Sequence, residues 1–359
     1  MKLSFSSPAL QTPDTHRHPV EGVRPVTRPI PVAPAEQTTW IRLDALHAHV
    51  VDITKRYATD EQATYIADKI VLAERMGVPT HGLHYFLGAL LPHLKVERIN
   101  EAPIHTMGSI IISDGDGGVG FWQLHRCLQT ASDIARKVGV AMCVMKMPGK
   151  VGALRVFCRE LMDQGQVVIM AKNTAPTVGL AQTGEPVVGT NPLCIGLPDT
   201  NFIYDSSTST IATNRVRLMN KYGVRAPATI GLDAQLEPTD KPAATVENGG
   251  FLLPFGFGPY WFKSFFLGVA IEAFGALAGG NTSHRVGETT GPRLHSREGM
   301  IAIVADKSAF PDYDNYLQQV SMLLGELEQH GLKIPGDYDE NVEHANVLKV
   351  DWENLQLEV

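Results

Sequence analysis

His81 lies in the turn sequence Pro79-Thr80-His81-Gly82, which closes a long amphipathic segment. An imidazole changes its charge near neutral pH, so it can give or take a proton during a reaction. Further along come the polar segments Gly189-Thr190-Asn191-Pro192 and Asp205-Ser206-Ser207-Thr208-Ser209, and then Lys263. A histidine beside a glycine is common in ordinary turns, and it is the whole set in this order that indicates a functional site.

The helices and strands that position these residues must come from a chain that is long enough to form one large domain or two interleaved domains. It has 359 residues, 44% of them hydrophobic, and 33 glycines, which suits a compact α/β protein. The net charge of −7, without clustered Lys and Arg, excludes a nucleic-acid partner and favours a small-molecule substrate. No CxxC spacing occurs, so we expect no metal site and reduced core cysteines in a cytoplasmic protein, at Cys127, Cys143, Cys158 and Cys194.

Neither of the two segments that could target the chain to a membrane has the required sequence pattern. Met1–Gln37 is rich in proline and lacks the apolar run of a signal peptide, so residues 1–39 are expected to form a flexible arm. The one apolar stretch of membrane length, Phe251–Gly280, is interrupted by glycines, prolines, Lys263 and Glu272. It predicts a buried core helix.

Hydrophobic periodicity predicts alternating helices and strands. Residues 42–75 read as two helices broken near Asp60, which we expect to be an N-cap. Further helices are expected at 122–137, 153–164, 264–278 and 312–330. Strands are expected at 109–113, 140–145, 167–171, 192–197, 202–205, 251–253 and 300–304. The mixture gives an α/β or α+β class.

The run Gly115–Gly120 satisfies the G-x-G-x-x-G pattern of a Rossmann phosphate loop, since it follows a strand and opens a helix. We interpret it otherwise. A Rossmann unit needs an acidic residue at the end of its second strand, and the segment Val140–Met147 ends in Lys146 and Met147.

From about Trp40 onward, the polar set of the opening paragraph resembles the malate/L-lactate dehydrogenase family of NAD(P)-dependent oxidoreductases. The resemblance implies a non-Rossmann fold, with a cofactor-binding sheet domain at 141–299 and a helical substrate domain built from both chain ends, 40–140 with 300–359. It also implies a soluble homodimer that reduces 2-oxo acids or cyclic imino acids. In this family a similar glycine turn is not the dinucleotide site.

By the same resemblance His81 is the proton donor, and Thr80 keeps the hydroxyl of the family's preceding serine; alternatively, His81 only caps or packs. The cofactor positions implied are Asn173, Thr174, Thr190, Asn191, Asp205, Ser206, Ser207, Ser209, Lys263, Gly336 and Asp337. Nothing in the sequence separates NADH from NADPH, although Arg155 could meet a 2′-phosphate.

Three departures from the family pattern concern the substrate. Tyr85, preceded by His84, stands where relatives have a carboxylate-binding arginine, and a phenol lacks the charge and the paired donors of a guanidinium. Lys150 replaces a second histidine and could donate a proton, pair with a carboxylate, bind cofactor phosphate or simply be solvated. The third departure is Arg215, ten residues past Asp205, at a position that is acidic, basic or apolar among relatives. Arg215 or Lys150 is expected to hold the substrate anion.

The aromatic run around Lys263, from Phe255 to Phe266, could line the pocket or pack a subunit interface. Together these residues predict an NADH- or NADPH-dependent reductase of a small 2-oxo acid, cyclic imine or related substrate. The alternative is a member that keeps the fold but serves as a non-redox catalyst or binding protein. The presence of both Lys263 and Asp205 favours the reductase.

Overall fold

A computed structural model describes residues 32–96, 99, 101–115, 117–256, 258–283 and 297–358. Most of the expected N-terminal arm, residues 1–31, lies outside them. The helices are α1 (Leu43–Thr54), α2 (Asp60–Arg75), α3 (Leu83–Tyr85), α4 (Leu91–Val96), α5 (Gly120–Val138), α6 (Arg155–Met162), α7 (Thr213–Lys221), α8 (Pro242–Val246), α9 (Phe262–Leu277), α11 (Tyr313–Gln329) and α12 (Lys349–Glu358). Shorter helical turns are η1 (Ala35–Gln37), η2 (Pro79–His81), η3 (Phe86–Leu90) and η4 (Lys307–Ala309).

The strands form three sheets within the described residues. The largest has the order β2-β3-β4-β13-β5-β8-β9, from Ile104–Met107, Ile110–Asp114, Val140–Lys146, Gly299–Asp306, Gln166–Lys172, Leu193–Gly196 and Ile203–Ser206. A smaller one has the order β11-β10-β12-β6-β7, from Pro238–Thr239, Gly231–Leu232, Phe251–Leu252, Val178–Gly179 and Pro186–Val188. The third pairs β1 (Thr38–Arg42) with β14 (His344–Leu348).

The large sheet confirms the expected mixed class. Only β3 and β4 run parallel, and every other neighbouring pair in this sheet is antiparallel. A Rossmann domain requires a mostly parallel sheet, so this is another fold. The sheet also runs across the domain boundaries expected at 140 and 300, because β3 pairs with β4 and β13 lies between β4 and β5.

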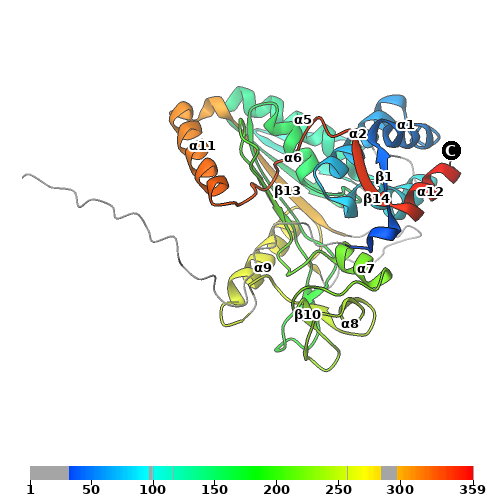
Figure 1. Cartoon of the computed structure of the whole chain (residues 1–359). Coiled ribbons are helices and arrows are strands. Elements are labelled where there is room, and N and C mark those ends of the chain that lie inside the picture. Colours follow the sequence, from blue (N-terminus) through cyan, green and yellow to red (C-terminus); the bar gives the residue numbers. More distant parts are fainter. Residues whose placement is uncertain are drawn as a thin grey trace, which may run out of the picture. The chain divides into compact units, whose positions relative to one another are not determined.

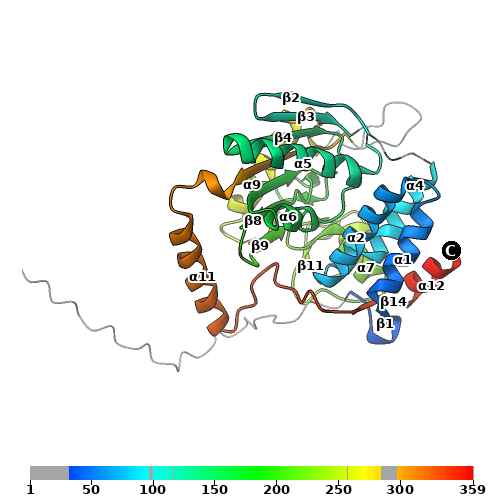
Figure 2. The same cartoon turned by 90° about the horizontal axis from the view of Figure 1, so that it is seen from above.

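Both faces of the large sheet are covered, which follows from the period of two along its strands. In β4, Ala141, Cys143 and Met145 point into the core beneath α5 and α6. Met142 and Val144 point to the other face, where α9 packs against β13 and β5. Figure 2 looks onto this sheet with α5 and α6 in front of it. All four cysteines are buried and free, as expected for core residues.

The helical part joins residues from far apart in the sequence. α1 and α2 pack together through the predicted apolar positions, and α12 packs against α1. Figure 1 shows β1 beside β14, which brings the region before α1 next to the region before α12. Elements from the two ends of the described chain therefore lie side by side in this part of the fold.

One helix start differs from the sequence prediction. Thr59, not Asp60, caps α2: its side chain accepts from the Gln62 amide at 3.3 Å, and the Gln62 side chain accepts from the Thr59 amide at 3.0 Å. This reciprocal capping box leaves Asp60 as the first helical residue, where its charge still favours the helix dipole.

The glycine run between β3 and α5 binds its own chain. Among the described residues its amides donate to main-chain carbonyls of the loop after β4, from Gly115 to Lys146 at 2.8 Å, from Gly117 to Met147 at 2.9 Å and from Gly120 to Lys150 at 3.0 Å. A Cβ at Gly120 would overlap the Pro148 carbonyl. These amides are therefore not available to cradle a phosphate, which agrees with the rejection of the Rossmann interpretation.

No helix in the described ranges combines the length and the apolarity that crossing a bilayer requires. This includes α9, the helix inside the long apolar stretch, whose buried face contacts the sheet.

Candidate functional site

His81 ends the short turn η2 and is held by its neighbours. Its amide donates to the Val78 carbonyl at 2.9 Å, and the buried Thr80 hydroxyl lies 3.0 Å from His81 Nδ1. Because Thr80 occupies Nδ1, Nε2 is the nitrogen left to face a ligand. Thr80 thus orients the imidazole.

Behind this turn lies a buried carboxylate that the sequence analysis did not single out. The Leu83 amide donates to Glu74 Oε1 at 2.7 Å, and a Cβ at Gly82 would overlap that oxygen. Glycine at position 82 therefore leaves room for the Glu74 carboxylate. Burial raises the pKa of Glu74 to about 7. The available signal was a glutamate four residues after Ile70, on the apolar face of α2.

Several residues singled out in the sequence lie close enough to His81 to change its pKa. Burial lowers the pKa of His81 to about 4, the negative charge of Asp205 acts in the opposite direction, and Arg155 and His84 lower it further. His81 is therefore neutral at pH 7 in the ligand-free protein. Asp205, Arg155 and His84 therefore all lie close enough to His81 to act on its imidazole.

Asp205 is fixed by Arg155, the first residue of α6. The carboxylate Oδ2 accepts from Arg155 Nε at 3.1 Å and from its amide at 3.2 Å, while Nη2 donates to the Asp205 carbonyl at 3.0 Å. Both side chains are mostly buried, at 21% and 11% exposed. The sequence analysis considered Arg155 only for a 2′-phosphate, whereas the structure places it beside His81 and Asp205.

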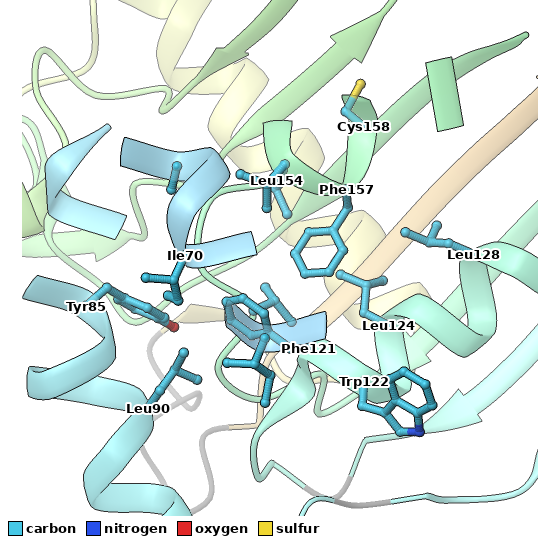
Figure 3. Packing of buried hydrophobic residues seen from close by; sticks show 14 of the residues in the cluster. Ile70, Tyr85, Leu90, Phe121, Trp122, Leu124, Leu128, Leu154, Phe157 and Cys158 are labelled. Carbon is cyan, nitrogen blue, oxygen red and sulfur yellow. The ribbon is translucent and has the colours of Figure 1, made fainter. Parts of the chain in front are cut away.

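Tyr85 and His84, the expected substrate-side residues, have different partners. Tyr85 is buried; its hydroxyl accepts from the Gly152 amide at 3.2 Å, and its ring lies 5.5 Å from that of His81. Figure 3 shows Tyr85 packed among apolar side chains near Phe121. His84 Nδ1 lies 2.9 Å from Asp351 of α12.

Lys150 and Arg215, the expected anion holders, lie on segments that border this turn. Lys150 lies in the loop that reaches Tyr85 through Gly152, and its amide donates to the Gly118 carbonyl at 3.0 Å. Arg215 is on α7, which packs against η2, and burial lowers its pKa. Arg155 is a third cation, and both it and its ion-pair partner Asp205 act on the charge of His81.

The expected cofactor residues of three loops lie together. The Thr174 amide donates to Asn191 Oδ1 at 3.0 Å, and the hydroxyls of Thr174 and Thr190 are 3.4 Å apart. The Thr208 amide donates to the Thr190 carbonyl at 2.8 Å, which attaches the loop from Asp205 to Ser209. In that loop the hydroxyls of Ser206, Ser207 and Ser209 hydrogen-bond locally.

Two of these residues, Asn173 and Asn191, use their side chains for hydrogen bonds within the protein. Asn173 is fully buried, and its amide group bonds Glu272, the Asn281 carbonyl and the Gly299 amide. Asn191 is equally buried and donates to Glu272 at 2.6 Å. These amide side chains hold the loops, so a ligand would meet the half-exposed Thr174 and Thr190 instead.

Lys263 stands exposed in the first turn of α9, with Nζ 5.3 Å from the centre of the Tyr260 ring. Farther along α9, a Cβ at Gly268 would lie 3.1 Å from Thr208 Oγ1, so this helix borders the serine loop. Lys263 is about 7.5 Å along the axis from that point. Lys263 thus lies on the helix that borders the serine loop, nearer to the N-terminal end of that helix.

Gly336 and Asp337 are not brought to this cluster. The Ile203 amide donates to the Pro335 carbonyl at 2.7 Å, and Asp337 accepts from the Asn201 side chain at 3.3 Å. Both contacts are at the first residues of β9, whereas Asp205 is near its last residue. In this chain the Pro-Gly turn supports the opposite end of that strand.

The described part of the chain contains no group of three or more His, Cys, Asp or Glu side chains arranged to hold a metal ion. The polar groups that the structure gathers here are the imidazole of His81, the Arg155–Asp205 pair and the hydroxyl-bearing loops.

Comparisons with known proteins agree with this geometry. A model of the malate/L-lactate dehydrogenase family matches residues 41–346. An L-sulfolactate dehydrogenase of Methanocaldococcus jannaschii is 26% identical over 308 residues, which cover 81% of this chain and 86% of that protein. A Delta(1)-pyrroline-2-carboxylate/Delta(1)-piperideine-2-carboxylate reductase of Pseudomonas aeruginosa is 27% identical over 306 residues, covering 82% and 89%.

The fold is also shared with solved structures. The crystal structure of delta1-piperideine-2-carboxylate reductase from Pseudomonas syringae pv. tomato superposes with a TM-score of 0.74 at 24% identity, covering 89% of this chain and 100% of that one. Since the family model spans most of the sequence, the chain belongs to the malate/L-lactate dehydrogenase family of dehydrogenases and reductases.

Proposed function

We propose that this protein reduces a small 2-oxo acid or cyclic imine carboxylate with NADH or NADPH, and that His81 is the proton donor. The observation that supports this best is the convergence of Asp205, Arg155 and His84 on the half-buried imidazole of His81. Relatives named for sulfolactate, malate and cyclic imine carboxylates fit this substrate class.

The loops fit a dinucleotide by the chemistry of their donors. Thr174, Thr190, Ser206 and Ser207 present half-buried hydroxyls from neighbouring loops, suited to ribose and phosphate oxygens, and Lys263 adds an exposed ammonium. The bound nicotinamide supplies the hydride. Asp205 acts on His81 and begins the loop that carries Ser206 and Ser207, which supports a cofactor bound beside the acid.

The proton leaves His81 Nε2 for the carbonyl oxygen or imine nitrogen of the substrate. Thr80 at Nδ1 fixes the ring orientation, and Asp205 favours the charged imidazolium. A substrate carboxylate meets one of three cations, Arg155, Arg215 or Lys150. Arg155 is the best supported because it is the cation that both contacts Asp205 and acts on His81.

A direct experiment is to titrate the purified protein with NADH and with NADPH, following cofactor fluorescence, and then to screen 2-oxo acids and cyclic imine carboxylates for cofactor oxidation. We expect micromolar binding of one cofactor and turnover of at least one substrate class. Binding without turnover of either class would favour the non-redox alternative. Absence of binding would refute the reductase.

We also propose that the protein is a homodimer in the cytoplasm. α9 buries one face against the sheet and exposes an apolar strip on the other: Phe262, Phe266, Val269, Phe274 and Leu277. A helix apolar on both faces suits burial by a second subunit, and four free cysteines suit a reducing compartment. Light scattering should give twice the chain mass, and Phe266→Asp should give monomers.

A further inference from the structure

We infer that Glu272, a buried carboxylate of α9, is a positioning residue that holds the cofactor-side loops in their binding arrangement. This inference rests on the proposed function, since it concerns the same loops. Glu272 is 5% exposed and lies on the face of α9 that meets the large sheet. A charged group in such a place is costly unless hydrogen bonds compensate it.

Both oxygens of Glu272 are surrounded by donors. Among the described residues five donor groups reach the carboxylate: the Gly189 amide at 3.1 Å, the Asn191 side chain at 2.6 Å, the Asn173 side chain at 3.1 Å, the Ser283 amide at 2.7 Å and the Ser283 hydroxyl. An ionised carboxylate has about four lone-pair sites, so its capacity is filled.

These donors come from separate segments. Asn173 follows β5, Gly189 and Asn191 precede β8, and Ser283 lies beyond the end of α9. Ser283 also links them, because its hydroxyl lies 2.7 Å from the Thr174 carbonyl and accepts from the Gly189 amide at 2.8 Å. One carboxylate therefore sets the distance between the Asn173-Thr174 pair and the Thr190-Asn191 pair.

The backbone around Glu272 is shaped for these contacts. A Cβ at Gly275 would overlap the Asn173 amide, so glycine lets that side chain approach the helix. Asn191 has a φ of 36°, in the left-handed region where the backbone of a non-glycine residue is strained. Its hydrogen bonds to Glu272 and to the Gly268 carbonyl at 3.0 Å hold it there.

The same helix bears the exposed lysine expected to meet the cofactor phosphates, Lys263, nine positions before Glu272 on the helix that spans Phe262–Leu277. Glu272 contacts none of the hydroxyls that would bind the dinucleotide, except through the residues it holds. Its effect on binding is therefore indirect, through Thr174 and Thr190.

The test compares two charge-neutralising substitutions of the same shape. Glu272→Gln keeps the side-chain volume but turns one oxygen into a donor facing donors. Glu160→Gln is the control: Glu160 is also a partly buried carboxylate, paired with Lys69 at 2.6 Å, but it lies between α2 and α6. Both should lower the melting temperature. Only Glu272→Gln should weaken binding of NADH or NADPH, by at least tenfold, and raise its KM with kcat at saturating cofactor nearly retained.

A milder variant keeps the test decisive if Glu272→Gln fails to fold. Ser283→Ala removes one donor, the hydroxyl, and keeps the amide, so it should weaken cofactor binding two- to fivefold in a folded protein. Unchanged affinity in the folded variants, or equal loss in Glu160→Gln, would overturn the role of Glu272 alone. A wild-type protein that binds neither cofactor would overturn the proposed function, and this inference with it.

Discussion

The Arg155 guanidinium donates to the Asp205 carboxylate at 3.1 Å and to the Asp205 carbonyl at 3.0 Å. The two residues act on His81 with opposite sign, since Asp205 raises its pKa and Arg155 lowers it. The ion pair therefore sets how easily His81 takes up a proton. A substrate anion that draws Arg155 away from Asp205 would make His81 more basic when the substrate is bound.

Substitution of Arg155 tests whether this residue lowers the pKa of His81. In Arg155→Ala the pKa of His81 should rise, by up to about one unit, because a nearby positive charge is lost. The limb of the kcat/KM–pH profile that reports His81 should move to higher pH. Arg159→Ala is the matched control on the same helix, since Arg159 pairs with Asp163. A profile identical in both variants would remove Arg155 from the site.

His81 itself should govern both directions of the reaction. Its pKa is about 4 in the free protein, so neutral His81 serves as the base for oxidation above about pH 5. Oxidation kcat/KM should be level above that pH and fall below pH 4, whereas reduction should lose kcat/KM as pH rises. His81→Asn should lower turnover roughly 100- to 10,000-fold with cofactor affinity retained. Full activity in that variant, with His49→Asn as control, would refute the assignment.

Lys263 offers a test of the cofactor site. Lys263→Ala should weaken dinucleotide binding by about 1–3 kcal/mol, the range for a lost charge-assisted hydrogen bond. Lys221→Ala is a close control, because its Nζ lies 5.4 Å from the Tyr222 ring much as Lys263 lies 5.3 Å from Tyr260. Gly117→Ala, at a φ of 71°, should destabilise the protein but leave the affinity of folded material unchanged. Selective loss of binding there would revive the Rossmann interpretation.

Glu74 predicts a pH dependence of stability. Its folded-state pKa of about 7 is raised by burial, so its contribution to stability is full below its unfolded value near 4.5 and is lost as pH rises through 7. Between pH 5 and pH 8 the free energy of unfolding should fall by about 3 kcal/mol from this group. Glu74→Gln keeps the acceptor for the Leu83 amide and should abolish that part of the fall, as measured by urea unfolding at both pH values.

Local sequence pattern predicted the elements well where burial is periodic. The spacing of Leu46, Val50 and Ile53 placed α1, and the same reasoning placed α5 and α9 to within a few residues. The pairing of β1 with β14 escaped it, because no local signal links strands at opposite ends of a chain. Thr59 was passed over for Asp60 because both are good caps and only the Gln62 contact decides between them.

The sequence predicted which segments carry the candidate site better than it predicted what each side chain contacts. His81, Thr190 and Asp205 lie on adjoining segments. The buried Glu74 and Glu272 were not assigned, because a carboxylate on an apolar helix face gives no sign of which loop it will meet. The side chain of Asn173 was expected to face a ligand, and its burial against Glu272 depends on Gly275, a contact across the fold.

The link between His84 and Asp351 spans 267 positions of sequence, and it lies next to the turn that bears His81. During synthesis the turn emerges from the ribosome long before α12, and β1 waits longer still for β14. The His81 region must therefore persist without these partners while most of the chain is made. The order of synthesis thus leaves the contact between His84 and Asp351 among the last that the chain can make.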